Sequence, residues 1–164
     1  MGSLDVGGRL PSLTLPALAS ERSINLRGQG RQSTVLVLPH PDCSACRAEL
    51  EELAERTDEL DDWDATPLAV VTEADRELAD ALPYPVLLDD DGQAHARCGV
   101  AEGEAALVVA DPWGEIYEVS RSDDDHAFPD GDELVSWVRY LSMRCPECGV
   151  PDRPLTGRLE GPVV

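Results

Sequence analysis

Two cysteines separated by two residues, Cys43 and Cys46, are the strongest candidates for chemistry in this sequence. They follow an apolar, β-rich run at residues 34–38 and precede a stretch with helical spacing. At such a strand-to-helix turn, unpaired backbone N–H groups and the positive end of the helix dipole favour a thiolate on the first sulfur. The second sulfur, three residues on, can turn back to close a disulfide. The pattern therefore predicts a reactive cysteine pair.

A second pair, Cys145 and Cys148, lies near the C-terminus in the sequence Cys-Pro-Glu-Cys-Gly. This sequence is similar to the knuckle of zinc ribbons and rubredoxins, in which a turn directs two thiolates at one metal ion. A structural zinc site needs four ligands, and one knuckle supplies two. Three interpretations stay open: an accessory redox pair that relays electrons, a zinc site shared between subunits, and a reduced pair without a function.

The composition fits one folded domain with a strongly acidic surface. The chain has 164 residues, of which 33 are acidic and 13 are Arg or Lys, all of them Arg, and this gives a net charge of −20. Such a field disfavours nucleic acid and anionic membranes as partners. It also suits a salt-rich cytoplasm, which we state as a hypothesis about habitat. Because there is no apolar run of membrane-spanning length and no apolar signal-peptide core, we expect a cytoplasmic protein.

Strands and helices are expected to alternate around the first cysteine pair. The pattern predicts an extended lead at 10–16, strands at 23–26, 34–38, 66–71 and 85–89, helices at 44–60, 73–82 and 132–143, and a hairpin that joins 105–110 to 115–119. The residues from 144 on are rich in proline and glycine, so we expect them to be irregular. This order predicts an α/β protein whose mixed β-sheet is covered by helices.

Three other residues with reactive or ligating side chains are not expected to take part in catalysis or metal binding. Cys98 has no cysteine near it in the sequence and is expected to be a small buried hydrophobe. His95 and His126 lie in polar, acidic stretches without the spacing of a metal site, so we expect both at the surface.

In this order, the segments resemble the redoxin branch of the thioredoxin superfamily, which includes the alkyl hydroperoxide reductase/thiol-specific antioxidant proteins. The resemblance covers about residues 10–141. It rests on Leu-Pro-Ser-Leu-Thr-Leu-Pro at 10–16, the strand before the first cysteine pair, Tyr-Pro-Val-Leu-Leu-Asp at 84–89, Cys-Gly-Val at 98–100 and Leu-Val-Val-Ala-Asp at 107–111. It implies a thioredoxin-like fold over residues 1–143, with a central mixed β-sheet flanked by helices, and an irregular cysteine-containing tail over residues 144–164.

The resemblance also implies roles for the residues of the first pair. Cys43 would be the exposed attacking thiol, and Cys46 would resolve the mixed disulfide that forms. Arg47 would add a favourable positive charge near the site. Asp42 would act in the opposite direction and raise the pKa of the thiol, because a neighbouring carboxylate disfavours a second anion.

Two positions depart from the pattern of the family. His40 takes the place of a threonine that organises the peroxide in peroxiredoxins, three residues before the reactive cysteine; His40 could instead act as a local base. Ala105 takes the place of the cis-proline of thioredoxin-like proteins, and we expect a trans peptide bond there because a cis bond before a non-proline residue costs about 3 kcal/mol.

The sequence therefore predicts a cytoplasmic thiol–disulfide oxidoreductase that uses Cys43 and Cys46 and needs no organic cofactor. Its partners would be a protein or small-molecule disulfide or peroxide as substrate and a thiol as electron donor, without nucleic acid or membrane. One alternative is a thiol-dependent peroxidase with Cys43 as the peroxidatic residue. Another is a redox-inactive thioredoxin-fold module that binds zinc through its cysteine pairs, with Cys145 and Cys148 among the ligands.

Overall fold

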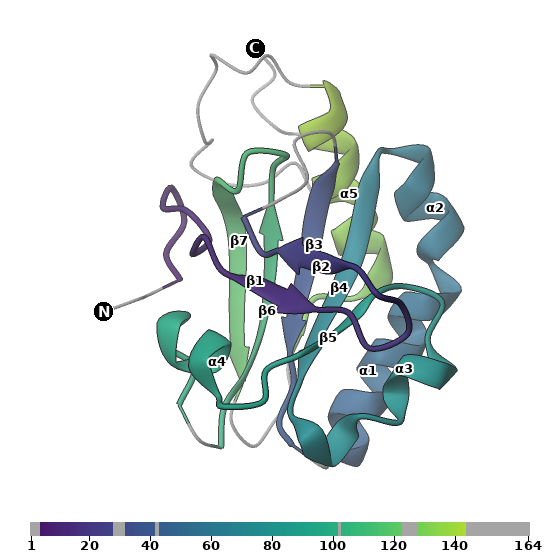
Figure 1. The fold of residues 1–164 in the computed structure, drawn as a ribbon. Coiled ribbons are helices and arrows are strands. Elements are labelled where there is room, and N and C mark those ends of the chain that lie inside the picture. Colours follow the sequence, from purple (N-terminus) through teal and green to yellow (C-terminus); the bar gives the residue numbers. More distant parts are fainter. Residues whose placement is uncertain (1–3, 28–31, 42, 102, 123–127, 144–164) are drawn as a thin grey trace.

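A five-stranded mixed sheet forms the centre of the molecule (Figure 1). The computed structural model describes residues 4–27, 32–41, 43–101, 103–122 and 128–143. The strand order is β5-β4-β3-β6-β7, with bounds Val86–Leu88, Ala65–Val71, Ser33–Leu38, Ala105–Ala110 and Ile116–Ser122. Strands β3, β4 and β5 run parallel, whereas β6 is antiparallel to both β3 and β7. The predicted mixed sheet is confirmed.

The central strand β3 is buried on both faces, as its continuous apolar sequence predicts. Because successive side chains of a strand point to opposite faces, β3 contributes to two separate cores. Val35 and Val37 belong to the core on one side of the sheet, and Leu36 and Leu38 belong to the core on the other side. This double burial fixes the end of β3 at Leu38, from which the loop to the first cysteine pair leaves.

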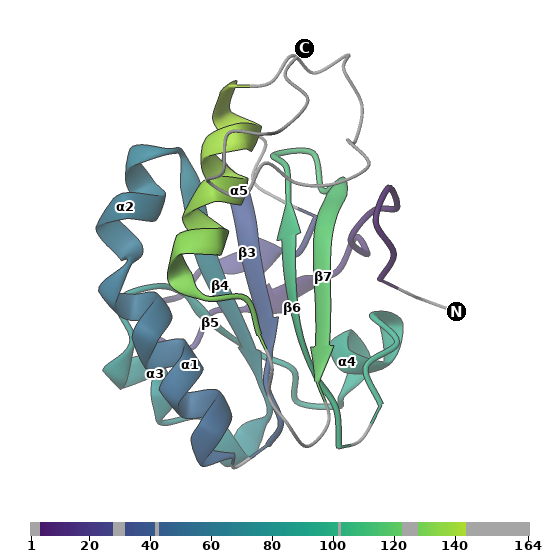
Figure 2. The same cartoon turned by 180° about the vertical axis from the view of Figure 1, so that it is seen from behind.

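The helices α1 (Ser44–Glu55), α2 (Thr57–Asp62) and α5 (Gly131–Met143) cover one face of the sheet (Figure 2). Each places leucines in the same core, such as Leu50 in α1 and Leu60 in α2. Helix α5 adds Leu134, Trp137, Val138 and Leu141, the residues of one helical face.

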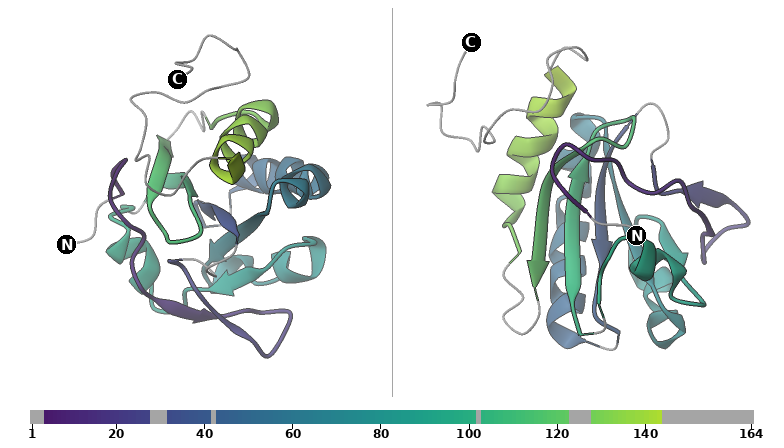
Figure 3. Two further views of the ribbon diagram at one scale, coloured as in Figure 1. Left: turned by 90° about the horizontal axis from the view of Figure 1, so that it is seen from above. Right: turned by 90° about the vertical axis from the view of Figure 1, so that its left-hand side faces the viewer.

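A small hairpin and a short helix cover the other face (Figure 3). The hairpin pairs β1 (Thr14–Pro16) with β2 (Ser23–Asn25), and the helix is α4 (Gln93–Arg97). Leu15, Ile24 and Ala94 from these elements pack in the same core as Leu36. The extended lead thus becomes a strand only at its end, and α4 was not predicted because it is short and mostly polar.

Two predicted helices are interrupted in the structure. The helix expected at 44–60 ends as α1 and restarts as α2, because Arg56 has a ψ of 6° and leaves the helical conformation. At this break the hydroxyl of Thr57 donates a hydrogen bond to the carbonyl oxygen of Ala54 at 2.8 Å. The segment expected at 73–82 is a 3₁₀ turn, η1 (Glu73–Asp75), followed by a single α-helical turn, α3 (Leu78–Ala81).

The turn between β6 and β7 confirms the predicted hairpin and requires its glycine. The side chain of Asp111 accepts hydrogen bonds from the backbone N–H groups of Trp113 and Glu115, both at 2.9 Å. Gly114 has a φ of +85°, and a Cβ atom there would lie 2.6 Å from the carbonyl oxygen of Arg27. Both the conformation and the close approach of the chain exclude a side chain at this position.

The predicted C-terminal tail, residues 144–164, lies outside the described residues. In the part of the chain that the structure does describe, no helix is both long and apolar enough to cross a membrane.

Candidate active site at the Cys43–Cys46 pair

The first cysteine pair lies where the central strand passes into α1. After β3 ends at Leu38, Cys43 takes an extended conformation as the N-cap of α1, and its Sγ accepts the backbone N–H of Cys46 at 3.4 Å. The first sulfur therefore lies at the N-terminus of a helix of 12 residues, where the dipole favours an anion. Sulfur takes the position that a hydroxyl or carboxylate oxygen has in most helix caps.

The two thiols differ in exposure and in pKa. Cys43 is half-buried, whereas Cys46 is 1% exposed. Burial acts to raise the pKa of Cys43, but hydrogen bonds to its sulfur, first among them the one from the backbone N–H of Cys46, outweigh it, so the pKa lies below its ordinary value. Burial raises the pKa of Cys46 to about 12, and the neighbouring Cys43 and Asp75 add to this effect. One sulfur thus suits a thiolate and the other a thiol.

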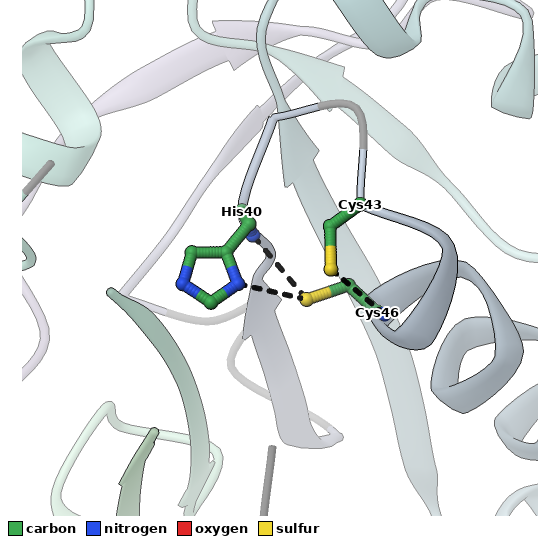
Figure 4. A group of neighbouring side chains, drawn as sticks. All are labelled: His40, Cys43 and Cys46. Atoms are coloured by element: carbon green, nitrogen blue, oxygen red, sulfur yellow. Dashed lines mark hydrogen bonds between the residues drawn. The ribbon is translucent and has the colours of Figure 1, made fainter. Parts of the chain in front are cut away.

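The imidazole of His40 lies beside the second sulfur (Figure 4). Its Nδ1 is 3.5 Å from Sγ of Cys46, and the backbone N–H of His40 donates to the same sulfur at 3.4 Å. The other ring nitrogen, Nε2, is hydrogen-bonded to the carbonyl oxygen of Gly103. Because a carbonyl can only accept, Nε2 carries the proton in the neutral ring and Nδ1 presents its lone pair to Cys46.

The pairing of β3 with β6 explains how His40 reaches Gly103. The two strands are antiparallel, and Leu38 at the end of β3 lies opposite Ala106 near the start of β6. The loop that follows β3 and the loop that precedes β6 therefore lie at the same end of the sheet. Ala105 begins β6 as a fully buried residue, and no peptide bond among the described residues is cis, so the bond before it is trans as expected.

Arg47 follows Cys46 in the sequence, but its guanidinium is paired with two carboxylates. Its Nη2 donates to Asp75 in η1 at 2.7 Å and also to Glu77. Asp75 is 2% exposed, and its charge helps to keep Cys46 protonated. Sequence reasoning missed Asp75, because nothing in the local sequence Glu-Ala-Asp marks it as buried beside a cysteine 29 positions away.

Of the other predicted site residues, Asp42 and the second pair, Cys145 and Cys148, lie outside the described residues. Cys98 is fully buried, as predicted, and burial raises its pKa to about 12. Among the predicted site residues that the structure describes, Cys43, Cys46 and His40 lie together.

His95 is not the surface residue that the sequence predicts. Its side chain is 14% exposed, and its Nδ1 lies 2.7 Å from a carboxylate oxygen of the fully buried Asp89. The same carboxylate accepts the backbone N–H groups of Ala94 and His95 and so holds the first turn of α4. His95, Pro41, Gly103 and Glu104 are among the residues that line an open pocket of about 260 Å³ next to the cysteine loop.

Comparisons with known proteins agree with this architecture. The model of the AhpC/TSA family matches residues 6–119, which is more than half of the chain. No curated protein matches the sequence.

Solved structures show the same fold at low sequence identity. AhpC of Mycobacterium tuberculosis is 21% identical with a TM-score of 0.68, over 85% of this chain and 94% of that one. A secreted disulfide oxidoreductase of M. tuberculosis, homologous to E. coli DsbE, is 24% identical with a TM-score of 0.59, over 79% and 96%. The exposed lipoprotein thioredoxin of Streptococcus pneumoniae is 23% identical with a TM-score of 0.61, over 79% and 98%. The chain therefore belongs to the AhpC/TSA family, whose members are redox proteins with a thioredoxin-like fold.

Proposed function

We propose that this protein is a thiol–disulfide oxidoreductase in which Cys43 attacks and Cys46 resolves. The observation that carries the proposal is the unequal placement of the two sulfurs: Sγ of Cys43 caps α1 in a half-buried position, and Cys46 is buried behind it. A thiolate is the attacking species in disulfide exchange. Cys43 is therefore the sulfur that a substrate can reach, and Cys46 is available to resolve the mixed disulfide in the next step.

In the first step, the thiolate of Cys43 attacks one sulfur of a substrate disulfide. A bond forms between Cys43 and that sulfur, the substrate S–S bond breaks, and the departing thiolate takes a proton from water. The helix N-terminus, which had stabilised the thiolate, then faces a neutral mixed disulfide. Once Cys43 no longer carries a charge, one of the causes that raise the pKa of Cys46 is removed.

In the second step, Cys46 loses its proton and attacks Sγ of Cys43. Nδ1 of His40 lies 3.5 Å from Sγ of Cys46 with its lone pair free of the proton, so it is placed to accept the thiol proton. The Cys43–Cys46 disulfide forms, and the remaining substrate thiolate leaves and is protonated. Two electrons pass from the protein to the substrate, and a thiol donor later returns them.

Peroxide reduction is a second candidate, supported by the match to the AhpC/TSA family and by the fold shared with mycobacterial AhpC. In that reaction the thiolate of Cys43 would attack one peroxide oxygen, the O–O bond would break, and the other oxygen would leave as water or an alcohol; the sulfenic acid formed on Cys43 would then condense with the Cys46 thiol to a disulfide and release water. His40 in place of the family's threonine counts against this candidate, because the imidazole is occupied by Cys46 and Gly103. We place either activity in the cytoplasm, as the sequence led us to expect.

The test compares the reduction of insulin disulfides and the consumption of hydrogen peroxide by wild type and single variants. We expect wild type to reduce the disulfide, Cys43→Ser to be inactive, and Cys46→Ser to accumulate a mixed disulfide that mass spectrometry detects. Cys98→Ala serves as the matched control, because it removes a thiol that is fully buried in the core beneath β1 and β2. Rapid peroxide turnover without disulfide reduction would favour the second candidate. The absence of both activities, with no reversible Cys43–Cys46 disulfide, would overturn the proposal.

A further inference from the structure

Three side chains of the site share a geometry that the redox steps alone do not require. Sγ of Cys43, Sγ of Cys46 and a ring nitrogen of His40 all lie within 4.8 Å of one another. We propose that the reduced protein binds one zinc ion through these three atoms, with the fourth position open to solvent. Binding needs only the reduced thiols and does not depend on the proposed function.

The separation between two of the donors already fits a zinc site. Tetrahedral zinc holds sulfur at about 2.3 Å and nitrogen at about 2.0–2.1 Å, so its nitrogen and sulfur ligands are about 3.6 Å apart. Nδ1 of His40 and Sγ of Cys46 are 3.5 Å apart. The sulfur of Cys43, at most 4.8 Å from each, would have to move inward by no more than about an ångström. Cys43 is half-buried at the N-cap of α1 and is the more exposed of the two cysteines.

The three ligand atoms have the hydrogen-bond partners that are typical of metal ligands. A histidine that binds zinc usually donates its other ring N–H to a carbonyl or carboxylate, which fixes the tautomer. Nε2 of His40 makes this contact with the carbonyl oxygen of Gly103, so Nδ1 is left as the ligand atom. Each sulfur accepts a backbone N–H, Cys43 from Cys46 and Cys46 from His40, and such donors stabilise the negative charge of a bound thiolate.

Binding and disulfide formation would exclude each other. A small-molecule disulfide that oxidises the zinc-bound pair takes up two electrons and two protons and leaves as two thiols, while the Cys43–Cys46 bond forms and Zn²⁺ is released. This release, unlike the binding, depends on the proposed function. Zinc would therefore occupy the site only in the reduced protein.

The test uses the full chain with Cys145→Ser and Cys148→Ser, so that the second pair cannot bind the metal. Zn²⁺ is titrated against a coloured chelator under reducing conditions, and Co²⁺ is used as a spectroscopic probe of thiolate and imidazole ligation. We expect about one zinc ion per chain, and in His40→Ala a loss of affinity of at least about 100-fold, since even outer-shell partners contribute 10–100-fold. His40→Cys, which supplies another ligand at that position, should restore tight binding. His95→Ala is the matched control and should bind as the parent does.

Two results would overturn the inference: no stoichiometric zinc in the reduced parent, or unchanged affinity in His40→Ala. The circular dichroism of each variant shows whether it folds, and the rescue by His40→Cys separates loss of a ligand from loss of structure. If the same protein reduces disulfides but binds no zinc, the inference fails and the proposed function stands. If it binds zinc through His40 but reduces no disulfide, the proposed function fails and the inference stands.

Discussion

The unequal pKa values of the two thiols predict how fast each reacts with iodoacetamide. The pKa of Cys46, about 12 against an ordinary 9.0, leaves this residue with about 1000-fold less thiolate at pH 8 than an unperturbed cysteine. A thiolate of higher pKa is also a better nucleophile, and with a Brønsted slope of about 0.4–0.5 this returns a factor of about 16–32. Cys46 should therefore react about 30–60-fold more slowly than an ordinary thiol. Its exposure of 1% slows it further.

The assay is a time course of alkylation on the fully reduced chain, in the presence of a chelator, read by peptide mass spectrometry. Because the pKa of Cys43 lies below the ordinary value, its rate should level off at a lower pH than that of a free cysteine, while the rate of Cys46 still rises at pH 10. Denatured protein provides the reference, in which both cysteines should react alike. Equal rates for Cys43 and Cys46 in the folded protein at pH 8 would refute the assignment of attacking and resolving thiols.

Three further predictions concern the elements that support the site. Leu50→Ala should lower the free energy of unfolding by about 2–5 kcal/mol in urea titrations, because it opens a cavity beneath α1; a loss under 1 kcal/mol would show that Leu50 is not packed as described. Gly92→Ala should lower the free energy of unfolding by about 1–2 kcal/mol, because alanine must then adopt a left-handed backbone conformation in otherwise open space. Gly114→Ala should lower it distinctly more, because its Cβ would also meet the backbone of Arg27. Equal losses in the two variants would contradict this close approach. His95→Ala should cost about 1–3 kcal/mol, since the buried carboxylate of Asp89 loses a hydrogen bond, and it should leave the alkylation rate of Cys43 unchanged.

The fold could be predicted where a local pattern and the tertiary structure agree. The continuous apolar run of β3 and the apolar face of α5 were enough to predict that these elements are buried. The strand-to-helix turn likewise predicted that Cys43 lies at the N-terminus of a helix, and it is the N-cap of α1. The break at Arg56 could not be predicted, because the leucine spacing continues through it and only the Thr57 hydroxyl bond marks the change.

The site was less accessible to sequence reasoning, because its electrostatics depend on residues far apart in the chain. Arg47 is adjacent to Cys46 in sequence, yet its charge is directed to Asp75 in the turn after β4. The contact between His40 and Gly103 depends on the antiparallel pairing of β3 and β6. His95 looked polar and exposed, but Asp89, six residues earlier, turns back to bind it.

The double pairing of Arg47 has a consequence for the choice of substrate. Both Asp75 and Glu77 compete for this guanidinium, so it is poorly placed to attract an anionic substrate to Cys43. The chain as a whole carries a net charge of −20 and repels anions over a distance set by the ionic strength. Glutathione disulfide, an anion at neutral pH, should therefore react faster as salt is added, whereas a disulfide with cationic side chains should react more slowly. In a dilute medium the protein would select its disulfides by charge before any contact is made, and in concentrated salt that preference would fade.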